Sequence, residues 1–254
     1  VLVRAVLLDL EGTVFADERV LPGAVAAVTS LRESGIGVRF LTNIDSRPPS
    51  AVAAQLAGYG LDVPVAELFT PVTAAHVLFA GVKGASVRTV VSTALAGEFA
   101  SLNRTPPHTH VLVGDCRDVL DYAVLDAAFR DLRAGARLVA SQRGRYFHRD
   151  DGDHIDTGAV VAALEYAAGV RALVLGKPSA DFFTLAAASV GVSIEDCYVV
   201  GDDATTDIAG GRAAGARTVR VRTGKYADQR AAGIAEHADA TIDSIVDLPA
   251  LVIP

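Results

Sequence analysis

The fold can be predicted from one stretch near the start of the chain, Arg4-Ala5-Val6-Leu7-Leu8-Asp9-Leu10-Glu11-Gly12-Thr13. Its residues Val6, Leu7 and Leu8 form a short apolar run, which is typical of a buried strand in a parallel sheet. Asp9 follows this run directly, and a glycine turn comes next. Since ligands bind outside the carboxyl ends of strands in open α/β sheets, the pattern places Asp9 at a binding edge.

Three later apolar runs end in polar residues in the same way. Residues 38–41 lead into Thr42-Asn43, residues 172–175 into Gly176-Lys177-Pro178, and residues 197–200 into Gly201-Asp202-Asp203, with Asp207 shortly after. If all four runs are parallel strands of one sheet, their carboxyl ends meet in one crevice. We therefore expect a crevice lined by acidic residues, a lysine, a hydroxyl and an amide: Asp9, Glu11, Asp202, Asp203, Asp207, Lys177, Thr42 and Asn43.

This combination of side chains suits a phosphoryl group bound beside a metal ion. Carboxylates at close range repel one another and raise each other's pKa, which a divalent cation relieves. Mg²⁺ typically takes one or two carboxylates, waters and phosphate oxygens. Lys177 adds a positive charge, and Thr42 and Asn43 add neutral donors for phosphate oxygens. An aspartate beside Mg²⁺ can attack phosphorus and form an aspartyl-phosphate.

The spacing of the motifs predicts two domains. Thr42 and Lys177 are 135 residues apart in the sequence, whereas one βαβ crossover takes about 30 residues. We therefore predict an inserted α/β domain over residues 72–163, and a discontinuous core formed by residues 1–71 and 164–254. Residues 145–148 and 154–156 flank a segment with an Asp-Gly turn, which predicts a hairpin within the insertion.

The composition describes an ordinary globular protein. Of 254 residues, 51% are hydrophobic and 21% are charged, and the net charge of −7 argues against a nucleic-acid partner. No apolar stretch approaches the roughly 20 residues of a membrane span. The first strand begins so early that we expect no signal peptide. Cys116 and Cys197 lie far apart without metal-ligand spacing, which favours a reduced, cytoplasmic compartment.

The four motifs resemble, in order, those of the haloacid dehalogenase superfamily of phosphatases: Asp9-Leu10-Glu11-Gly12-Thr13, Thr42-Asn43, Gly176-Lys177-Pro178 and Gly201-Asp202-Asp203 with Asp207. The insertion is similar to the larger α/β cap of the NagD-like branch. Segments around residues 145–147, 163–167, 182–183 and 223–226 are similar to the phospholysine phosphohistidine inorganic pyrophosphate phosphatases. This resemblance implies an α/β fold, with a Rossmann-like parallel-sheet core and an inserted α/β cap domain.

The resemblance also implies an activity: a Mg²⁺-dependent phosphohydrolase of small phosphorylated molecules that works through an aspartyl-phosphate and forms a homodimer. It implies the following roles: Asp9 as nucleophile and metal ligand, Glu11 as general acid/base with a metal-binding main-chain carbonyl, Thr42, Asn43 and Lys177 in phosphate binding, Asp202 as metal ligand, and Asp207 as ligand or support.

One residue departs from the family pattern and keeps other functions open. Phosphatases of this superfamily usually carry aspartate where this chain has Glu11, which is one methylene longer. A non-hydrolytic phosphate-binding or regulatory protein is therefore one alternative, and a phosphoryl-transferring mutase is another. Single motifs also have plain structural explanations, since Asp9 could cap a turn and Asp207 could stabilise a helix N-terminus.

Overall fold

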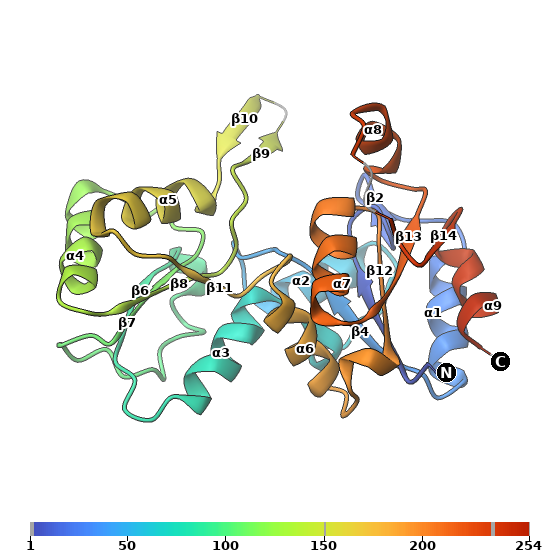
Figure 1. The fold of residues 1–254 in the computed structure, drawn as a ribbon, viewed down its shortest axis with the longest axis horizontal. Coiled ribbons are helices and arrows are strands. Elements are labelled where there is room, and N and C mark those ends of the chain that lie inside the picture. The colour runs from blue at the N-terminus through green and yellow to red at the C-terminus, as the bar shows by residue number, and fades with distance from the viewer. Residues whose placement is uncertain (1–2, 150, 235–236, 254) are drawn as a thin grey trace. The chain divides into compact units, whose positions relative to one another are not determined.

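The computed structural model describes residues 3–149, 151–234 and 237–253. It divides into two compact units. Unit 1 comprises Val1–Thr42, Ser50–Phe69 and Lys177–Pro254, and unit 2 comprises Asn43–Pro49 and Thr70–Gly176. Each unit contains a parallel β-sheet and helices (Figure 1). The predicted α/β fold class is therefore confirmed.

Unit 1 is built on a six-stranded sheet in the order β14-β13-β12-β1-β4-β5, with every neighbouring pair parallel. The strands are β1 (Ala5–Asp9), β4 (Gly37–Leu41), β5 (Leu68–Phe69), β12 (Cys197–Gly201), β13 (Arg217–Val221) and β14 (Ala240–Ile242). Strand β1 is buried along its whole length, as its apolar run predicts. A small antiparallel pair, β2 (Phe15–Ala16) and β3 (Arg19–Val20), follows it.

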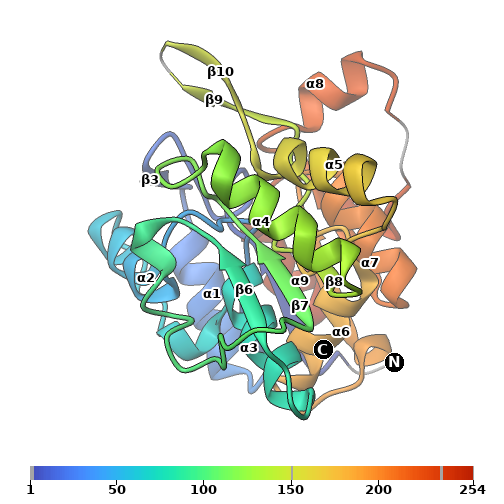
Figure 2. The same ribbon diagram turned by 90° about the vertical axis from the view of Figure 1, so that its left-hand side faces the viewer.

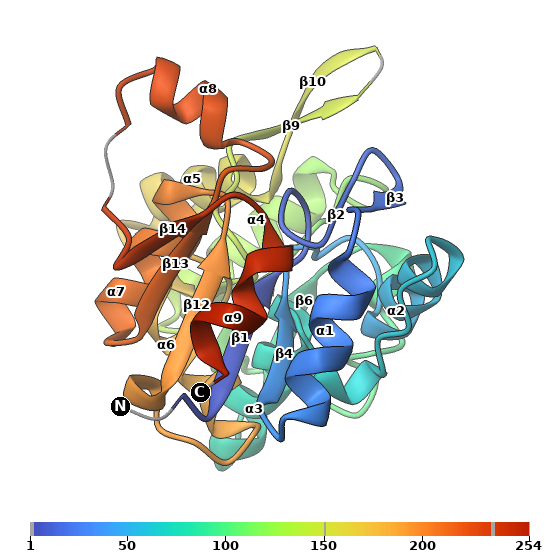
Figure 3. The same ribbon diagram turned by 90° about the vertical axis from the view of Figure 1, so that its right-hand side faces the viewer.

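Helices cover both faces of this sheet. Helices α1 (Ala24–Glu33) and α9 (Leu248–Val252) lie on one face, and α6 (Ala180–Ala188) and α7 (Ala209–Ala214) lie on the other (Figures 1 and 3). In α1 the buried residues Ala24, Ala27, Val28 and Leu31 follow the i, i+3, i+4, i+7 spacing of one helix face. The unit also contains α2 (Pro49–Gly58), α8 (Tyr226–Ala231), a π-helical turn (Ala204–Ile208) and short 3₁₀ turns (Val65–Glu67, Ile194–Asp196, Ile245–Asp247).

The strand order creates a switch point beside β1. The chain continues from β1 to β4 and β5 on one side, whereas β12, β13 and β14 extend the sheet on the other side. In the register of the sheet Asp9 is paired with Leu41, and Leu8 is paired with Val200. The residues that follow Leu41 and Val200 therefore share an edge with Asp9, at the position where open α/β sheets bind ligands.

Unit 2 has a four-stranded parallel sheet in the order β11-β8-β7-β6. The strands are β6 (Val87–Val90), β7 (His110–Val113), β8 (Arg137–Ala140) and β11 (Leu173–Val174), and the helices are α3 (Pro71–Gly81), α4 (Tyr122–Arg133), α5 (Thr157–Ala168) and a 3₁₀ turn (Thr93–Leu95). Helices α4 and α5 pack side by side on one face (Figure 2). The predicted hairpin is present as β9 (Tyr146–Arg149) and β10 (Gly152–Ile155), and residue 150 of its turn lies outside the described residues.

One predicted core strand is wrong. The run at residues 172–175 forms β11, which pairs with β8 of unit 2 through Leu173↔Val139 and Val174↔Ala140. Helix α5 also belongs to unit 2, where Val161 and Leu164 are buried in its hydrophobic cluster. The boundary between the compact units therefore falls between residues 176 and 177, and residues 43–49 and 70–71 also lie in unit 2. An apolar run shows that a strand is buried but not which sheet it joins.

Candidate active site

Asp9 is the last residue of β1, and its side chain is buried. The ammonium of Lys177 donates a hydrogen bond to Asp9 Oδ1, and the hydroxyl of Thr13 donates to Asp9 Oδ2 at 3.3 Å. Burial raises the pKa of Asp9 to about 6, although the charge of Lys177 opposes this effect. Both carboxylate oxygens of Asp9 thus have donors inside the protein.

A tight turn after β1 brings Thr13 back to Asp9. Main-chain N–H groups of Thr13 and Val14 both donate to the carbonyl of Leu10, at 3.3 and 2.8 Å. Gly12 has a φ of +83°, a conformation that L side chains rarely adopt. Glu11 lies on the same turn with an exposed side chain, and no hydrogen bond or ion pair involves that side chain within the described residues.

Two further carboxylates come from the end of β12 and the turn that follows it. Asp202 directly follows the strand, and Asp207 lies on the π-helical turn Ala204–Ile208. The main-chain N–H of Asp203 donates to Asp207 Oδ2 at 3.2 Å, which orients that carboxylate. A Cβ at Gly201 would lie 2.4 Å from the Asp207 carboxyl carbon, so this close approach requires glycine.

Asp203 is a structural residue rather than a member of the carboxylate cluster. Its side chain caps the π-helical turn by accepting hydrogen bonds from the main-chain N–H groups of Thr205 and Thr206. It also accepts from Gln229 Nε2 at 2.8 Å and from Lys225 Nζ at 2.9 Å. Burial would raise the pKa of Asp203, but these donors outweigh burial and hold it well below its usual range.

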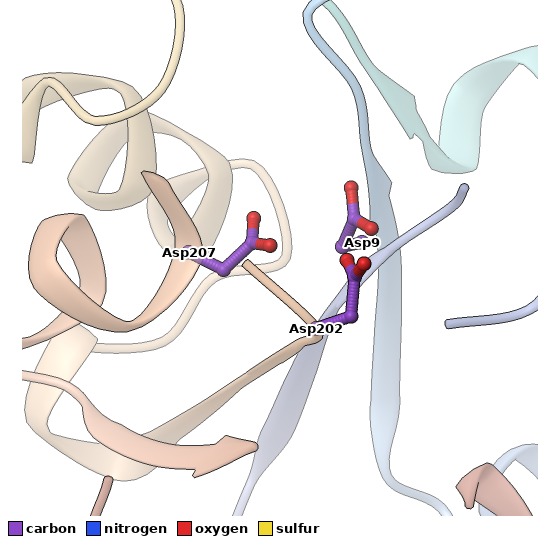
Figure 4. A group of neighbouring side chains, drawn as sticks. All are labelled: Asp9, Asp202 and Asp207. Atoms are coloured by element: carbon purple, nitrogen blue, oxygen red, sulfur yellow. The ribbon is translucent and has the colours of Figure 1, made fainter. Parts of the chain in front are cut away.

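Asp9, Asp202 and Asp207 form one buried carboxylate cluster, with ligand oxygens all within 4.8 Å of one another (Figure 4). Lys177 is buried beside them and donates to Asp207 Oδ1 at 2.6 Å as well as to Asp9. Burial and the charge of Asp9 together raise the pKa of Asp207 to about 7, although Lys177 opposes them. The pKa of Asp202 is also raised by burial. Burial alone would lower the pKa of Lys177, but Asp207 and Asp9 outweigh it and raise that pKa.

The charges and donor atoms of this cluster fit a hard divalent cation. Three ionised carboxylates and one ammonium leave two negative charges in a buried site, which costs free energy unless a cation compensates for them. Oxygen donors from aspartates are the ligands that Mg²⁺ and Ca²⁺ prefer, and the cluster contributes no nitrogen or sulfur donor.

Thr42 and Asn43 are neighbours in the sequence but belong to different units. Thr42 follows β4 in unit 1, where it is buried and its main-chain N–H donates to the carbonyl of Phe69 at 3.3 Å. Because its preceding residue pairs with Asp9, Thr42 lies at the same sheet edge as the carboxylates. Asn43 belongs to unit 2, where its amide oxygen lies next to Gly176.

Unit 1 therefore contains most of the residues that the sequence predicts for the site: Asp9, Glu11, Thr42, Lys177, Asp202 and Asp207. Sequence reasoning missed Thr13, although its place four residues after the strand-ending Asp9 within a glycine turn is a usable signal. It also missed the contacts of residues 223–225 with Asp202, which involve a main-chain donor.

In the part of the chain that the structure describes, no helix has the length and apolar character needed to span a membrane.

Comparison with protein families gives two matches. Residues 6–104 match the family described as "Haloacid dehalogenase-like hydrolase", and residues 174–248 match the one described as "HAD-hyrolase-like". The chain is 34% identical to phospholysine phosphohistidine inorganic pyrophosphate phosphatase of Xenopus laevis, with 96% of this chain and 91% of that protein covered. It is 35% identical to haloacid dehalogenase-like hydrolase domain-containing protein 2 of Bos taurus, with 88% and 85% covered.

Solved structures show the same likeness. NagD from E. coli K-12 has a TM-score of 0.88 at 25% identity, with 97% of this chain and 98% of that chain covered. The p-nitrophenyl phosphatase from Archaeoglobus fulgidus has a TM-score of 0.86 at 27% identity, with 99% and 100% covered. The chain therefore belongs to the haloacid dehalogenase superfamily of hydrolases. Within it the chain is a phosphatase, as its four motifs predict, and it belongs to the NagD-like branch, as its insertion predicts.

Proposed function

We propose that this phosphatase is a Mg²⁺-dependent phosphohydrolase of small phosphorylated molecules, and that the reaction passes through an aspartyl-phosphate on Asp9. The observation that carries the proposal is the buried cluster at the carboxyl end of β1, where Asp9 contacts Lys177 and lies within 4.8 Å of Asp202 and Asp207. The carboxylates of this cluster attract a cation, and the ammonium of Lys177 attracts a phosphoryl group.

The carboxylates of Asp9, Asp202 and Asp207 hold Mg²⁺ in this proposal, together with the main-chain carbonyl of Glu11. When bound, the cation neutralises negative charge on the carboxylates and on the phosphoryl oxygens. Lys177 supplies a second positive charge against the phosphoryl group, and the buried hydroxyl of Thr42 donates to one of its oxygens. The ammonium of Lys177 favours the ionised form of Asp9, which nucleophilic attack requires, although burial opposes it and raises the pKa of Asp9.

The reaction has two steps. In the first, a carboxylate oxygen of Asp9 attacks phosphorus, the bond from phosphorus to the leaving group breaks, and the leaving group takes a proton from Glu11. In the second, water attacks the phosphorus of the aspartyl-phosphate while Glu11 takes its proton. The phosphorus–Asp9 bond then breaks, which releases inorganic phosphate and restores both carboxyl groups. The exposed side chain of Glu11 on the turn after β1 is compatible with this exchange of protons.

The two compact units have different roles in the proposal. Unit 1 is the catalytic core, because it carries the carboxylate cluster, Lys177 and Thr42. Unit 2 is the cap, which shapes the substrate pocket and excludes water. Asn43, a residue of unit 2, has a role in phosphate binding in the proposal, as the family resemblance implies. The protein also forms a homodimer in the proposal, as its resemblance to the family implies. Light scattering at working concentration tests this, and the presence of monomer alone would refute it.

A cytoplasmic location is also part of the proposal. Cys116 and Cys197 are both buried free thiols, as expected for a protein in a reducing compartment. Fractionation of the source cells, followed by detection of the protein, tests this location. Recovery in an extracytoplasmic fraction would contradict it.

The experiment that tests the function is phosphate release across a substrate panel, with and without Mg²⁺. The names of the relatives suggest phospholysine, phosphohistidine, inorganic pyrophosphate and p-nitrophenyl phosphate, to which a sugar phosphate is added. We expect Mg²⁺-dependent release from at least one of them and loss of release in Asp9→Asn. The matched control is Asp62→Asn, which changes an exposed aspartate and leaves release unchanged.

Two other outcomes would favour the rival functions. Phosphate and Mg²⁺ binding without turnover on the whole panel would favour a regulatory or phosphate-binding protein. The appearance of labelled phosphate in an added acceptor instead of in water would favour a phosphoryl-transferring mutase. The substitution of Glu11 for the usual aspartate is the feature that makes the first rival worth testing.

A further inference from the structure

A loop from outside the four motifs lies against the carboxylate of Asp202. This loop follows β13 and consists of Thr223, Gly224 and Lys225, and we refer to it as the Asp202 loop. The main-chain N–H of Lys225 donates to Asp202 Oδ2 at 2.6 Å. The hydroxyl of Thr223 donates to the carbonyl of Gly12 at 2.5 Å. The loop is thereby tied both to Asp202 and to the turn that follows β1.

The space around Asp202 Oδ2 admits only glycine on two sides. A Cβ built at Gly224 would lie 2.1 Å from Asp202 Oδ2, and a Cβ built at Gly12 would lie 2.4 Å from it. Both glycines also have positive φ angles, +56° and +83°. The same oxygen is therefore enclosed by two glycine backbones and hydrogen-bonded by the N–H of Lys225.

Such an arrangement controls the orientation of the carboxylate. A carboxylate with one oxygen held by a main-chain donor cannot rotate freely about its Cβ–Cγ bond, so its other oxygen is fixed as well. Preorganised ligands lose less free energy on binding a cation than ligands that must first be ordered.

The side chain of Lys225 has a separate task. Its ammonium pairs with Asp203 Oδ2 at 2.9 Å, and the side chain is 65% exposed. Because an exposed ion pair contributes little free energy, its removal should change the loop only slightly. Asp203 keeps its other donors, from Gln229 and Thr205. The side chain and the main-chain N–H of Lys225 can therefore be tested independently.

We propose that the Asp202 loop positions Asp202 for the cation, with the main-chain N–H of Lys225 as the donor and Gly224 as the residue that allows the approach. This inference rests on the proposed function, in which Asp202 is a ligand of Mg²⁺. Of the three clustered carboxylates, only Asp202 has a described hydrogen bond to this loop. Lys225 and Gly224 act through Asp202, so they are positioning residues.

The test compares Lys225→Pro with Lys225→Ala. Lys225 has a φ of −71°, which lies in the range of proline. In Lys225→Pro the ring Cδ replaces the hydrogen that points at Asp202 Oδ2, so the variant removes the donor and pushes that carboxylate out of its position. Lys225→Ala removes the same side chain and keeps the N–H. The readout is the dissociation constant of Mg²⁺ for the full chain, measured by titration calorimetry without substrate. We expect Lys225→Ala to bind within about threefold of the parent protein, and Lys225→Pro about tenfold or more weaker than Lys225→Ala.

A second pair of variants decides the question if Lys225→Pro does not fold. Gly224→Ala keeps the N–H and introduces the Cβ beside Asp202 Oδ2. Its control is Gly233→Ala, because Gly233 has a comparable φ of +72° and open space where the Cβ would stand. Both substitutions impose the strain of a positive φ, but only Gly224→Ala should weaken Mg²⁺ binding. In that variant, turnover of p-nitrophenyl phosphate should recover in part at high Mg²⁺.

The possible failures are distinguishable. If the parent protein binds no Mg²⁺, the proposed function fails and the inference fails with it. If the parent protein binds Mg²⁺ while Lys225→Pro matches Lys225→Ala, the inference alone is overturned. Equal Mg²⁺ affinities for Gly224→Ala and Gly233→Ala overturn it in the same way.

Discussion

The ammonium of Lys177 donates a hydrogen bond to Asp207 Oδ1 at 2.6 Å, and both side chains are buried. Lys177 opens the last segment of unit 1, whereas Asp207 lies on the turn after β12. The same ammonium also contacts Asp9. One positive charge therefore serves two of the three clustered carboxylates, and the remaining negative charge is what the proposed cation would balance.

The first prediction concerns the stability contributed by Lys177. Lys177→Met removes the ammonium and leaves Asp9 and Asp207 without their shared ion-pair partner. We expect a loss of roughly 3 kcal/mol in the free energy of unfolding at alkaline pH without metal, because buried carboxylates lose their compensation. The loss should be smaller at acid pH, where both carboxyls take up protons. Denaturant titrations at several pH values measure this loss, with Lys225→Met as the exposed control. A loss in the free energy of unfolding of Lys177→Met that did not depend on pH would contradict the account.

The second prediction concerns the pH dependence of Mg²⁺ binding. Without metal the pKa is about 6 for Asp9 and about 7 for Asp207, so both carboxyls hold protons in mildly acidic solution. A cation must displace these protons, and its affinity should fall by about tenfold per pH unit for each proton displaced. Calorimetry in buffers of different ionisation enthalpy measures both the affinity and the protons released. An affinity that stays constant from about pH 5 to pH 8 would be incompatible with this cluster.

The third prediction concerns Asp45, a buried residue of unit 2. Burial, together with the charges of Asp156 and Asp115, raises its pKa from 3.8 to about 6. The hydroxyls of Ser141 and Thr157 donate to its carboxylate and oppose this rise. Since the folded pKa exceeds the unfolded one, the stabilising contribution is complete below pH 3.8 and is lost as the pH rises through 6.

Asp45→Asn abolishes this titration and keeps an oxygen acceptor for both hydroxyls. The variant should therefore gain stability relative to the parent protein as the pH rises from acid to neutral, by about 2–3 kcal/mol. Urea unfolding at several pH values measures the difference, with Asp62→Asn as the exposed control. A difference between parent and variant that does not change with pH would show that folding does not raise the pKa of Asp45.

The fourth prediction concerns Glu11 as the proton donor. If the extra methylene slows proton transfer, poor leaving groups should suffer most, because they need protonation in the transition state. Glu11→Asp should then speed the hydrolysis of alkyl phosphates more than that of p-nitrophenyl phosphate. Glu11→Ala should leave aryl turnover partly intact. If Glu11→Ala leaves turnover of every substrate unchanged, the general acid must be another residue.

Much of the site could be predicted because each buried strand ends in a residue that cannot remain buried without a partner. This applies to Asp9 after β1, Thr42 after β4 and Asp202 after β12, and all three lie at one edge of the sheet. The apolar runs and the order of the motifs are local features of the sequence. The prediction of these residues therefore required no knowledge of long-range contacts.

The parts that could not be predicted depend on long-range pairing or on the main chain. The run before Lys177 looks like any buried strand, and only its pairing with Val139 and Ala140 assigns it to unit 2. The assignment of Asn43 to unit 2 and of Thr42 to unit 1 likewise depends on contacts between residues far apart in the sequence. The contact of Lys225 with Asp202 uses a backbone N–H, which every residue except proline possesses, so it leaves no signature beyond the glycine that precedes it.

The central claim is that Asp9 carries the phosphoryl group during the reaction, and trapping the covalent intermediate tests it most directly. The protein is mixed with Mg²⁺ and a substrate labelled in its phosphoryl group, quenched in acid within the first turnover, and digested for peptide mapping. The account predicts label on the peptide that contains Asp9 and none in Asp9→Asn, whose turnover should fall by several powers of ten. Label on a different residue, or turnover of Asp9→Asn within about tenfold of the parent protein, would contradict it.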